Sequence, residues 1–130
     1  MTENPVDLKV LYVEDEPDLR ILMSELLTFM GYTVECVSNG QQGVEKALAW
    51  QPDVILMDVR MPIMDGPSAV RRLRDNAVTQ HTPIYMLSAY SDNYTRSMCE
   101  QAGATGFFVK PPDIAKIDAM LKRVLEHRKN

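Results

Sequence analysis

The sequence predicts an α/β fold in which a doubly wound, five-stranded parallel sheet carries helices on both faces. Short apolar segments rich in β-branched and aromatic residues alternate strictly with segments whose apolar residues recur at helical spacing. The loops between these segments are short, so each helix is a crossover between parallel neighbouring strands. In such a sheet, ligands bind at the carboxyl ends of the strands.

Five strands are expected, each a short and largely apolar run bounded by polar or turn-forming residues. They lie at 8–13, 32–37, 53–57, 83–87 and 106–109. The second strand ends in Ser38-Asn39-Gly40, an ordinary turn signal. We therefore expect it to be an edge strand away from the ligand-binding crevice.

The first helix follows Pro17, which suits a first helical turn, and ends before Gly31, which suits the position beyond a helix end. Its apolar residues at helical spacing are Leu19, Leu22, Met23, Leu26, Leu27 and Met30. The second and third helices are expected at 41–50 and 67–74. Their inward residues are Val44, Ala47, Leu48, Val70 and Leu73.

The last two helices differ in how firmly they should be anchored. The helix at 93–102 offers only Tyr94, Met98 and Ala102 as an apolar stripe, so we expect weak anchoring. The helix at 113–128 starts with Asp113 as a capping residue. Its strong apolar stripe is Ile114, Ile117, Met120, Leu121, Val124 and Leu125.

The composition is that of one soluble domain: 130 residues, 45% apolar and 25% charged. We expect a single domain over 1–130, with a core of about 7–128 and no output domain. The net charge of −4 and the lack of a long basic run argue against direct nucleic-acid binding. Short apolar runs and the N-terminal sequence argue against membrane spanning and secretion, so Cys36 and Cys99 are expected to be reduced thiols in the cytoplasm.

Polar side chains follow four of the five strands at the edge where ligands bind. They are Glu14, Asp15, Glu16, Asp58, Ser88 and Lys110. Three carboxylates in one place need a cation, and an oxygen-only ligand set selects Mg²⁺ or Mn²⁺. The lysine and the serine hydroxyl suit phosphate oxygens, so the set as a whole predicts phosphoryl transfer to a carboxylate.

The chain resembles the receiver domain of bacterial-type two-component response regulators from about residue 8 to residue 128. The stretches that carry the resemblance are VEDEP at 13–17, PDVILMDVRMPIMDG at 52–66, LSA at 87–89 and GATGFFVKP at 103–111. The resemblance implies a flavodoxin-like sheet of strand order 2-1-3-4-5 with five helices. It also implies a signalling domain that catalyses its own phosphorylation and dephosphorylation, rather than a small-molecule enzyme.

The resemblance implies a role for each site residue. Asp58 accepts a phosphoryl group from a histidine kinase or a histidine phosphotransfer protein, while Lys110 and Ser88 hold phosphoryl oxygens. Mg²⁺ is bound by Asp15 and Asp58, by the backbone carbonyl of Arg60, and by Glu14 through water. Lys110-Pro111 is expected to be a cis peptide.

A conformational switch is also implied by the resemblance. Ser88 moves toward the phosphate and Phe107 turns inward, which changes the face built from 93–102, 106–109 and 113–128. That face then binds a downstream protein or a second copy of the chain. Arg60 and Tyr90 stand at positions that modulate how quickly the acyl phosphate is lost.

Other functions are weighed against this one. A phosphatase of the haloacid-dehalogenase type carries a second acid two residues after its nucleophile, where this chain has Arg60. A flavin or nucleotide binder needs a glycine-rich or hydroxyl-rich loop where this chain has the acidic residues 14–16. The remaining alternative is a scaffolding or dimerisation receiver whose output does not depend on phosphorylation.

Overall fold

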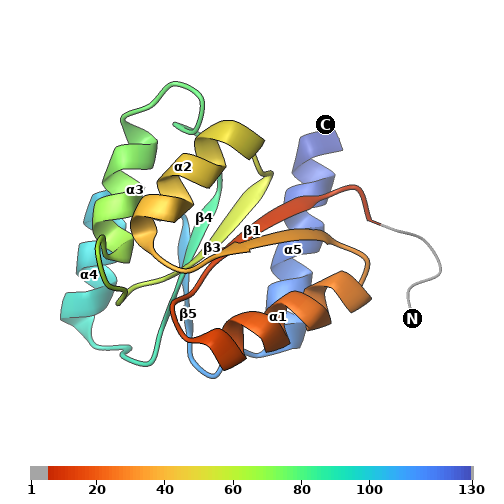
Figure 1. Ribbon diagram of the computed structural model, residues 1–130, viewed down its shortest axis with the longest axis horizontal. Coiled ribbons are helices and arrows are strands. Elements are labelled where there is room, and N and C mark those ends of the chain that lie inside the picture. Colours follow the sequence, from red (N-terminus) through yellow and green to blue (C-terminus); the bar gives the residue numbers. More distant parts are fainter. Residues whose placement is uncertain (1–5, 130) are drawn as a thin grey trace.

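The computed structural model describes residues 6–129 as a parallel sheet between two layers of helices (Figure 1). The strands are β1 (Lys9–Val13), β2 (Thr33–Val37), β3 (Val54–Asp58), β4 (Ile84–Ser88) and β5 (Gly106–Val109). The helices are α1 (Pro17–Phe29), α2 (Gly40–Trp50), α3 (Gly66–Arg74), α4 (Asn93–Ala102) and α5 (Ile114–Lys129). The strict alternation that the sequence predicts is confirmed.

The sheet is parallel throughout and has the strand order β2-β1-β3-β4-β5. Val10 of β1 stands opposite Val34 of β2 and Val54 of β3, so β1 separates the edge strand from the rest of the sheet. The strand order reverses here, between β1 and β3, and ligands of such sheets bind at the carboxyl ends of the strands at this point. The predicted fold class, strand order and edge position of β2 are therefore confirmed.

Side chains alternate between two cores, one on each face of the sheet. The core under α2, α3 and α4 contains Leu11, Val13, Ile55 and Met57 from the central strands. The core under α1 and α5 contains Val10, Tyr12, Val54 and Leu56. Figure 1 shows the same division, with α1 and α5 together on one side of the strands. β3 is buried along its whole length, so Asp58 at its end emerges from the centre of the sheet.

Helix ends follow the predicted signals. The side chain of Glu16 accepts hydrogen bonds from the backbone of Asp18 and Leu19 at the start of α1, and Gly31 beyond its end has φ of 102°. Asp113 caps α5 by accepting from the backbone N–H of Ala115 at 3.0 Å.

The buried faces of α2, α3 and α5 match the prediction, whereas α1 buries less of its apolar stripe. The predicted inward residues of α2, α3 and α5 are all buried or packed against a core. In α1, Met23 and Leu27 are buried, but Leu22 and Leu26 are 53% and 37% exposed. The apolar stripe of α1 is thus wider than the face that touches the sheet.

The predicted Tyr94–Met98 anchor of α4 is wrong. Tyr94 is 73% exposed and Met98 is half-buried, whereas Thr95, Cys99 and Ala102 face the core. Asp92 accepts hydrogen bonds from both the backbone N–H and the hydroxyl of Thr95, at 3.1 and 2.8 Å. Because its hydroxyl is paired, Thr95 can be buried at little cost, and the helix rotates by about one residue from the expected face.

No helix between residues 6 and 129 combines the length and apolar character needed to cross a membrane.

Cys36 in β2 and Cys99 in α4 are free thiols, as predicted.

Candidate functional site

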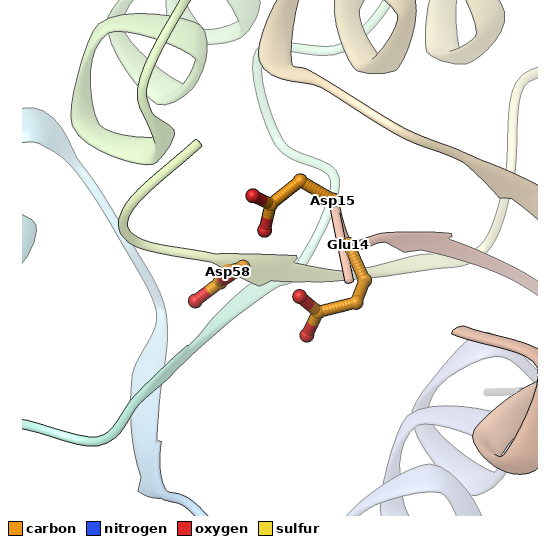
Figure 2. A group of neighbouring side chains, drawn as sticks. All are labelled: Glu14, Asp15 and Asp58. Atoms are coloured by element: carbon orange, nitrogen blue, oxygen red, sulfur yellow. The ribbon is translucent and has the colours of Figure 1, made fainter. Parts of the chain in front are cut away.

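An acidic triad lies at the point where the strand order reverses. Glu14 and Asp15 directly follow β1, and Asp58 is the last residue of the neighbouring strand β3. One carboxylate oxygen of each lies within 4.8 Å of the other two. Figure 2 shows the three side chains converging above the ends of the two strands. The predicted gathering of the three carboxylates is confirmed.

Backbone contacts fix the two loops that carry the triad. Glu14 donates its backbone N–H to the carbonyl of Val37, and Val59 donates to the carbonyl of Leu87. The loop after Asp58 returns to the sheet at Gly66, whose N–H donates to Val59 at 2.8 Å. A Cβ at Gly66 would lie 2.5 Å from the Asp58 carbonyl oxygen, so a glycine is needed for α3 to begin against the end of β3.

Lys110 supplies the positive charge of the site. It follows β5, its backbone N–H donates to the Ser88 carbonyl at 2.8 Å, and its bond to Pro111 is cis, as the resemblance implies. Its Nζ lies 3.2 Å from Asp58 Oδ1, so the two side chains form an ion pair. The contact with Glu14 Oε1 is shorter, at 2.7 Å, and the sequence did not predict it. One ammonium group therefore bridges two carboxylates.

The two buried carboxylates have opposite pKa shifts. Burial, reinforced by the nearby charge of Glu14, raises the pKa of Asp58 to about 7, even though Lys110 acts in the other direction. Burial also acts to raise the pKa of Glu14, but hydrogen bonds from Lys110 and from the backbone of Glu16 hold it below its usual range. Glu14 is thus the ionised partner of Lys110, while Asp58 bears the poorly compensated charge. Perturbed acids of this kind at a strand end are typical of functional sites.

The remaining predicted residues lie on β4, on β5 and in the loops that follow β3 and β4. Ser88 ends β4, is 2% exposed, and its Oγ accepts from the backbone N–H of Tyr90 at 3.0 Å. The Arg60 guanidinium lies 4.5 Å from the Tyr90 ring centre, so these two residues form a cation–π pair. Phe107 is half-buried in β5 under the guanidinium of Arg96 from α4, at 4.6 Å. A metal-binding role for the Arg60 carbonyl stays a prediction.

The donor set fits a magnesium ion. Octahedral Mg²⁺ holds oxygen ligands at about 2.0–2.1 Å, so oxygens sharing one ion are about 3–4 Å apart. The three carboxylate oxygens are within 4.8 Å of one another before any ion draws them together. Asp15 is exposed and leaves room for the water ligands that Mg²⁺ retains.

Two contacts of the triad and two contacts around it were not predicted from the sequence. The ion pair between Lys110 and Glu14 is the first of the two triad contacts. The hydroxyl of Tyr12 donates to Glu14 Oε1 at 3.3 Å inside the protein. The only signal was a tyrosine among the aliphatic residues at 10–13, two residues before an acid and therefore on the same side of the strand. The stacking of Arg60 on Tyr90 and of Arg96 on Phe107 joins residues of different elements, which no local pattern predicts.

A parallel sheet of this strand order, with an acidic triad and a lysine side chain at the point where the order reverses, is characteristic of the class of receiver domains. The profile of the family described as "Response regulator receiver domain" matches residues 10–122 of this chain. The chain therefore belongs to the receiver-domain family of two-component response regulators, which is not a family of small-molecule enzymes.

The comparisons with individual proteins agree. The chain is 33% identical to the response regulator ArlR of Staphylococcus aureus over 92% of its own length and 53% of ArlR. It is 30% identical to the regulatory protein AtoC of Escherichia coli over 91% of its length and 25% of AtoC. The chain thus spans about half and about a quarter of these curated relatives.

Solved structures extend the likeness to three dimensions. The receiver domain of the sensor histidine kinase PA1611 from Pseudomonas aeruginosa, which has a magnesium ion coordinated in its active site cleft, is 34% identical with a TM-score of 0.86. The match covers 92% of this chain and 98% of that one. The chemotaxis protein CheY4 of Vibrio cholerae is 35% identical with a TM-score of 0.84, over 90% and 98% of the two chains.

Proposed function

We propose that this chain is a phosphoacceptor signalling domain and that Asp58 receives a phosphoryl group from the phosphohistidine of a histidine kinase or a histidine phosphotransfer protein. The observation that carries the proposal is the lysine-bridged acidic triad at the switch point of a receiver fold. In the transfer, an Asp58 oxygen bonds to phosphorus as the phosphorus–nitrogen bond of the donor breaks. The imidazole leaves with the electron pair of that bond.

Each neighbouring residue has a role in stabilising the transferred group. Lys110, 3.2 Å from Asp58 Oδ1, neutralises charge on a phosphoryl oxygen, and the Ser88 hydroxyl donates to another. Asp15 and Asp58, the Arg60 carbonyl, and Glu14 through water would hold Mg²⁺. When bound, the ion supplies further charge neutralisation. The magnesium ion in the related PA1611 receiver supports this assignment.

Phosphorylation is proposed to act through Ser88 and Phe107 on the face formed by α4, β5 and α5. Two contacts support this route. Lys110 and Ser88 are joined by a backbone hydrogen bond across β5 and β4, and Phe107 of β5 lies under Arg96 of α4. Ser88 stands opposite Val109, two residues after Phe107 on β5, and we propose that a shift of Ser88 toward the phosphate reaches α4 through this strand and the Phe107 ring. The altered face is proposed to bind a downstream protein or a second copy of the chain.

The proposal is tested by comparing amide NMR spectra of the wild type and Asp58→Asn. Acetyl phosphate, or beryllofluoride, with Mg²⁺ is expected to shift amides near Asp58 and across α4, β5 and α5 in the wild type only. An unchanged wild-type spectrum, or equal changes in Asp58→Asn, would contradict phosphoacceptor function. Shifts confined to the triad would support acceptance of phosphate but contradict the proposed switch.

Two further assays test the alternative functions. Rapid, repeated hydrolysis of small phosphate esters would favour a phosphatase. Undiminished partner binding by Asp58→Asn under all conditions would favour a scaffolding role. We expect neither result.

A further inference from the structure

Glu14 is an unusual member of the acidic triad because its charge is completely enclosed. The residue is 0% exposed, whereas Asp15 in the same triad faces solvent. A carboxylate buried in this way is stable only if both oxygens are paired with donors. The hydrogen-bond donors to Glu14 therefore fix the position of its carboxylate group.

Three donors converge on the Glu14 carboxylate, two of them from residues two positions away in sequence and one from Lys110 after β5. Oε1 accepts from Lys110 Nζ at 2.7 Å and from the Tyr12 hydroxyl at 3.3 Å. Oε2 accepts from the backbone N–H of Glu16 at 3.2 Å. The lysine and the tyrosine share one oxygen, so the hydroxyl restrains the very atom that holds the ammonium group.

Tyr12 is itself rigidly placed. It lies in the middle of β1, is 0% exposed, and its ring belongs to the core beneath α1 and α5. Its hydroxyl reaches the edge of the site from below, while the ring cannot leave the core without opening a large cavity. Tyr12 can therefore act as a fixed support under Glu14 without contacting Asp58 or a phosphoryl group.

We propose that Tyr12 is a positioning residue: its hydroxyl fixes Glu14, and Glu14 in turn holds the Lys110 ammonium group beside Asp58. This inference rests on the proposed function and names an additional residue for it. Without the hydroxyl, Glu14 and Lys110 gain freedom to move as a pair away from Asp58. The site is then less preorganised both for Mg²⁺ and for the incoming phosphoryl group.

The test is the substitution Tyr12→Phe, which keeps the ring and removes the hydroxyl. The dissociation constant for Mg²⁺ is measured by titration calorimetry on the unphosphorylated protein, and the phosphorylation rate is measured with acetyl phosphate. We expect Mg²⁺ affinity and phosphorylation rate each to fall by about threefold to tenfold. This is at or below the lower end of the range of about tenfold to hundredfold for outer-shell substitutions, because the hydrogen bond is long. Unchanged values of both quantities would overturn the proposal.

Tyr32→Phe is the matched control. Tyr32 is also buried, and its hydroxyl donates to a carboxylate, Asp118 of α5, at 2.5 Å. This pair lies at the start of β2 and on α5, away from the triad. The control is expected to lower the denaturation midpoint but to leave Mg²⁺ affinity unchanged. If the two substitutions change Mg²⁺ affinity equally, Tyr12 has only a structural role.

A double-mutant cycle tests whether Tyr12 acts through Glu14. In a Glu14→Gln background, Tyr12→Phe is expected to have little further effect on Mg²⁺ affinity. An equal effect in both backgrounds would refute this route. A further outcome is that Tyr12→Phe weakens Mg²⁺ binding although acetyl phosphate does not modify the wild-type protein. In that case the proposed function fails while the positioning role stands.

Discussion

Asp58 lowers the stability of the folded protein at neutral pH because its carboxylate charge is buried. Its pKa is raised from an ordinary value of 3.8 to about 7, chiefly by burial and then by Glu14. The folded protein therefore binds this proton more tightly than the unfolded chain does. Consequently, the contribution of Asp58 to stability falls as the pH rises from about 4 to about 7, and the loss is complete above that interval.

This shift predicts that Asp58→Asn stabilises the metal-free protein. In EDTA at pH 8, the free energy of unfolding is expected to exceed that of the wild type by about 1–2 kcal/mol, because Asn has no charge to bury. The difference should grow between pH 4 and pH 7 and then stay constant. Urea denaturation at a series of pH values measures it. A difference that does not vary with pH would show that the Asp58 charge is not the cause.

The residues of the site differ in how visible they are in the sequence. Asp15, Asp58 and Lys110 were predictable because each follows or ends a strand, and parallel strands bring their carboxyl ends to one edge. The enclosure of Glu14 and its contact with Tyr12 were not predictable. They depend on how side chains from β1 and the end of β5 meet in space, which strand spacing does not specify.

The loop between β3 and α3, which begins directly after Asp58, contains a residue with a strained backbone conformation. Ile63 has φ of 71°, a left-handed conformation that is unfavourable for a β-branched residue. Its side chain is 81% exposed, so packing contacts do not offset the energy of the strained backbone. Ile63→Asn is expected to raise the free energy of unfolding by about 0.5–1 kcal/mol, because Asn tolerates this conformation better.

The control for Ile63→Asn is Val78→Asn. Val78 is also an exposed apolar residue, at 52%, but its φ is not positive. This substitution is expected to leave stability within about 0.5 kcal/mol of the wild type. Equal effects in urea denaturation would show that exposure, rather than backbone strain, governs both sites.

Arg74, the last residue of α3, joins this helix to two loops. Its Nε donates to the Gly103 carbonyl at 2.9 Å and its Nη1 to the Thr82 carbonyl at 2.7 Å, which ties α3 to the loops before β4 and β5. Arg74→Met is expected to cost about 2–3 kcal/mol, since the carbonyls lose charged donors. Arg74→Lys should recover only part of this, because one ammonium group cannot span both loops. A lysine variant as stable as the wild type would contradict this account.

At the level of whole elements, periodicity was sufficient to predict which segments are helices and strands, but it did not predict the buried face of every helix. In α5 the apolar stripe is strong, and its predicted residues Ile117 and Leu121 are fully buried. In α4 the stripe is weak, and the capping of Thr95 by Asp92 decides its orientation. A capped threonine and a cysteine do not stand out in a hydrophobic pattern, so the rotation of this helix could not be predicted.

At the scale of the whole molecule, the site exists only when the sheet is folded. The triad residues come from two neighbouring strands, and the lysine comes from the edge strand on the far side of the sheet. Glu14 and Asp15 follow β1, Asp58 ends β3 and Lys110 follows β5, with β4 lying between the last two. Separating these strands dismantles the site. A ligand of the triad therefore binds the folded chain in preference to the unfolded one, and its binding free energy adds to the stability of the molecule.

Mg²⁺ is accordingly expected to raise the global stability of the protein in a concentration-dependent way. At a concentration one hundred times its dissociation constant, the gain is about 2.7 kcal/mol. Asp15→Asn and Asp58→Asn should each remove most of this gain, because each takes a carboxylate from the ion. Asp75→Asn, an equal change in net charge at an exposed position after α3, should retain it. Thermal denaturation at a series of Mg²⁺ concentrations distinguishes these cases. Should Asp75→Asn lose as much of the gain as the triad variants, Mg²⁺ would be acting through general screening of a chain with net charge −4 rather than at the triad.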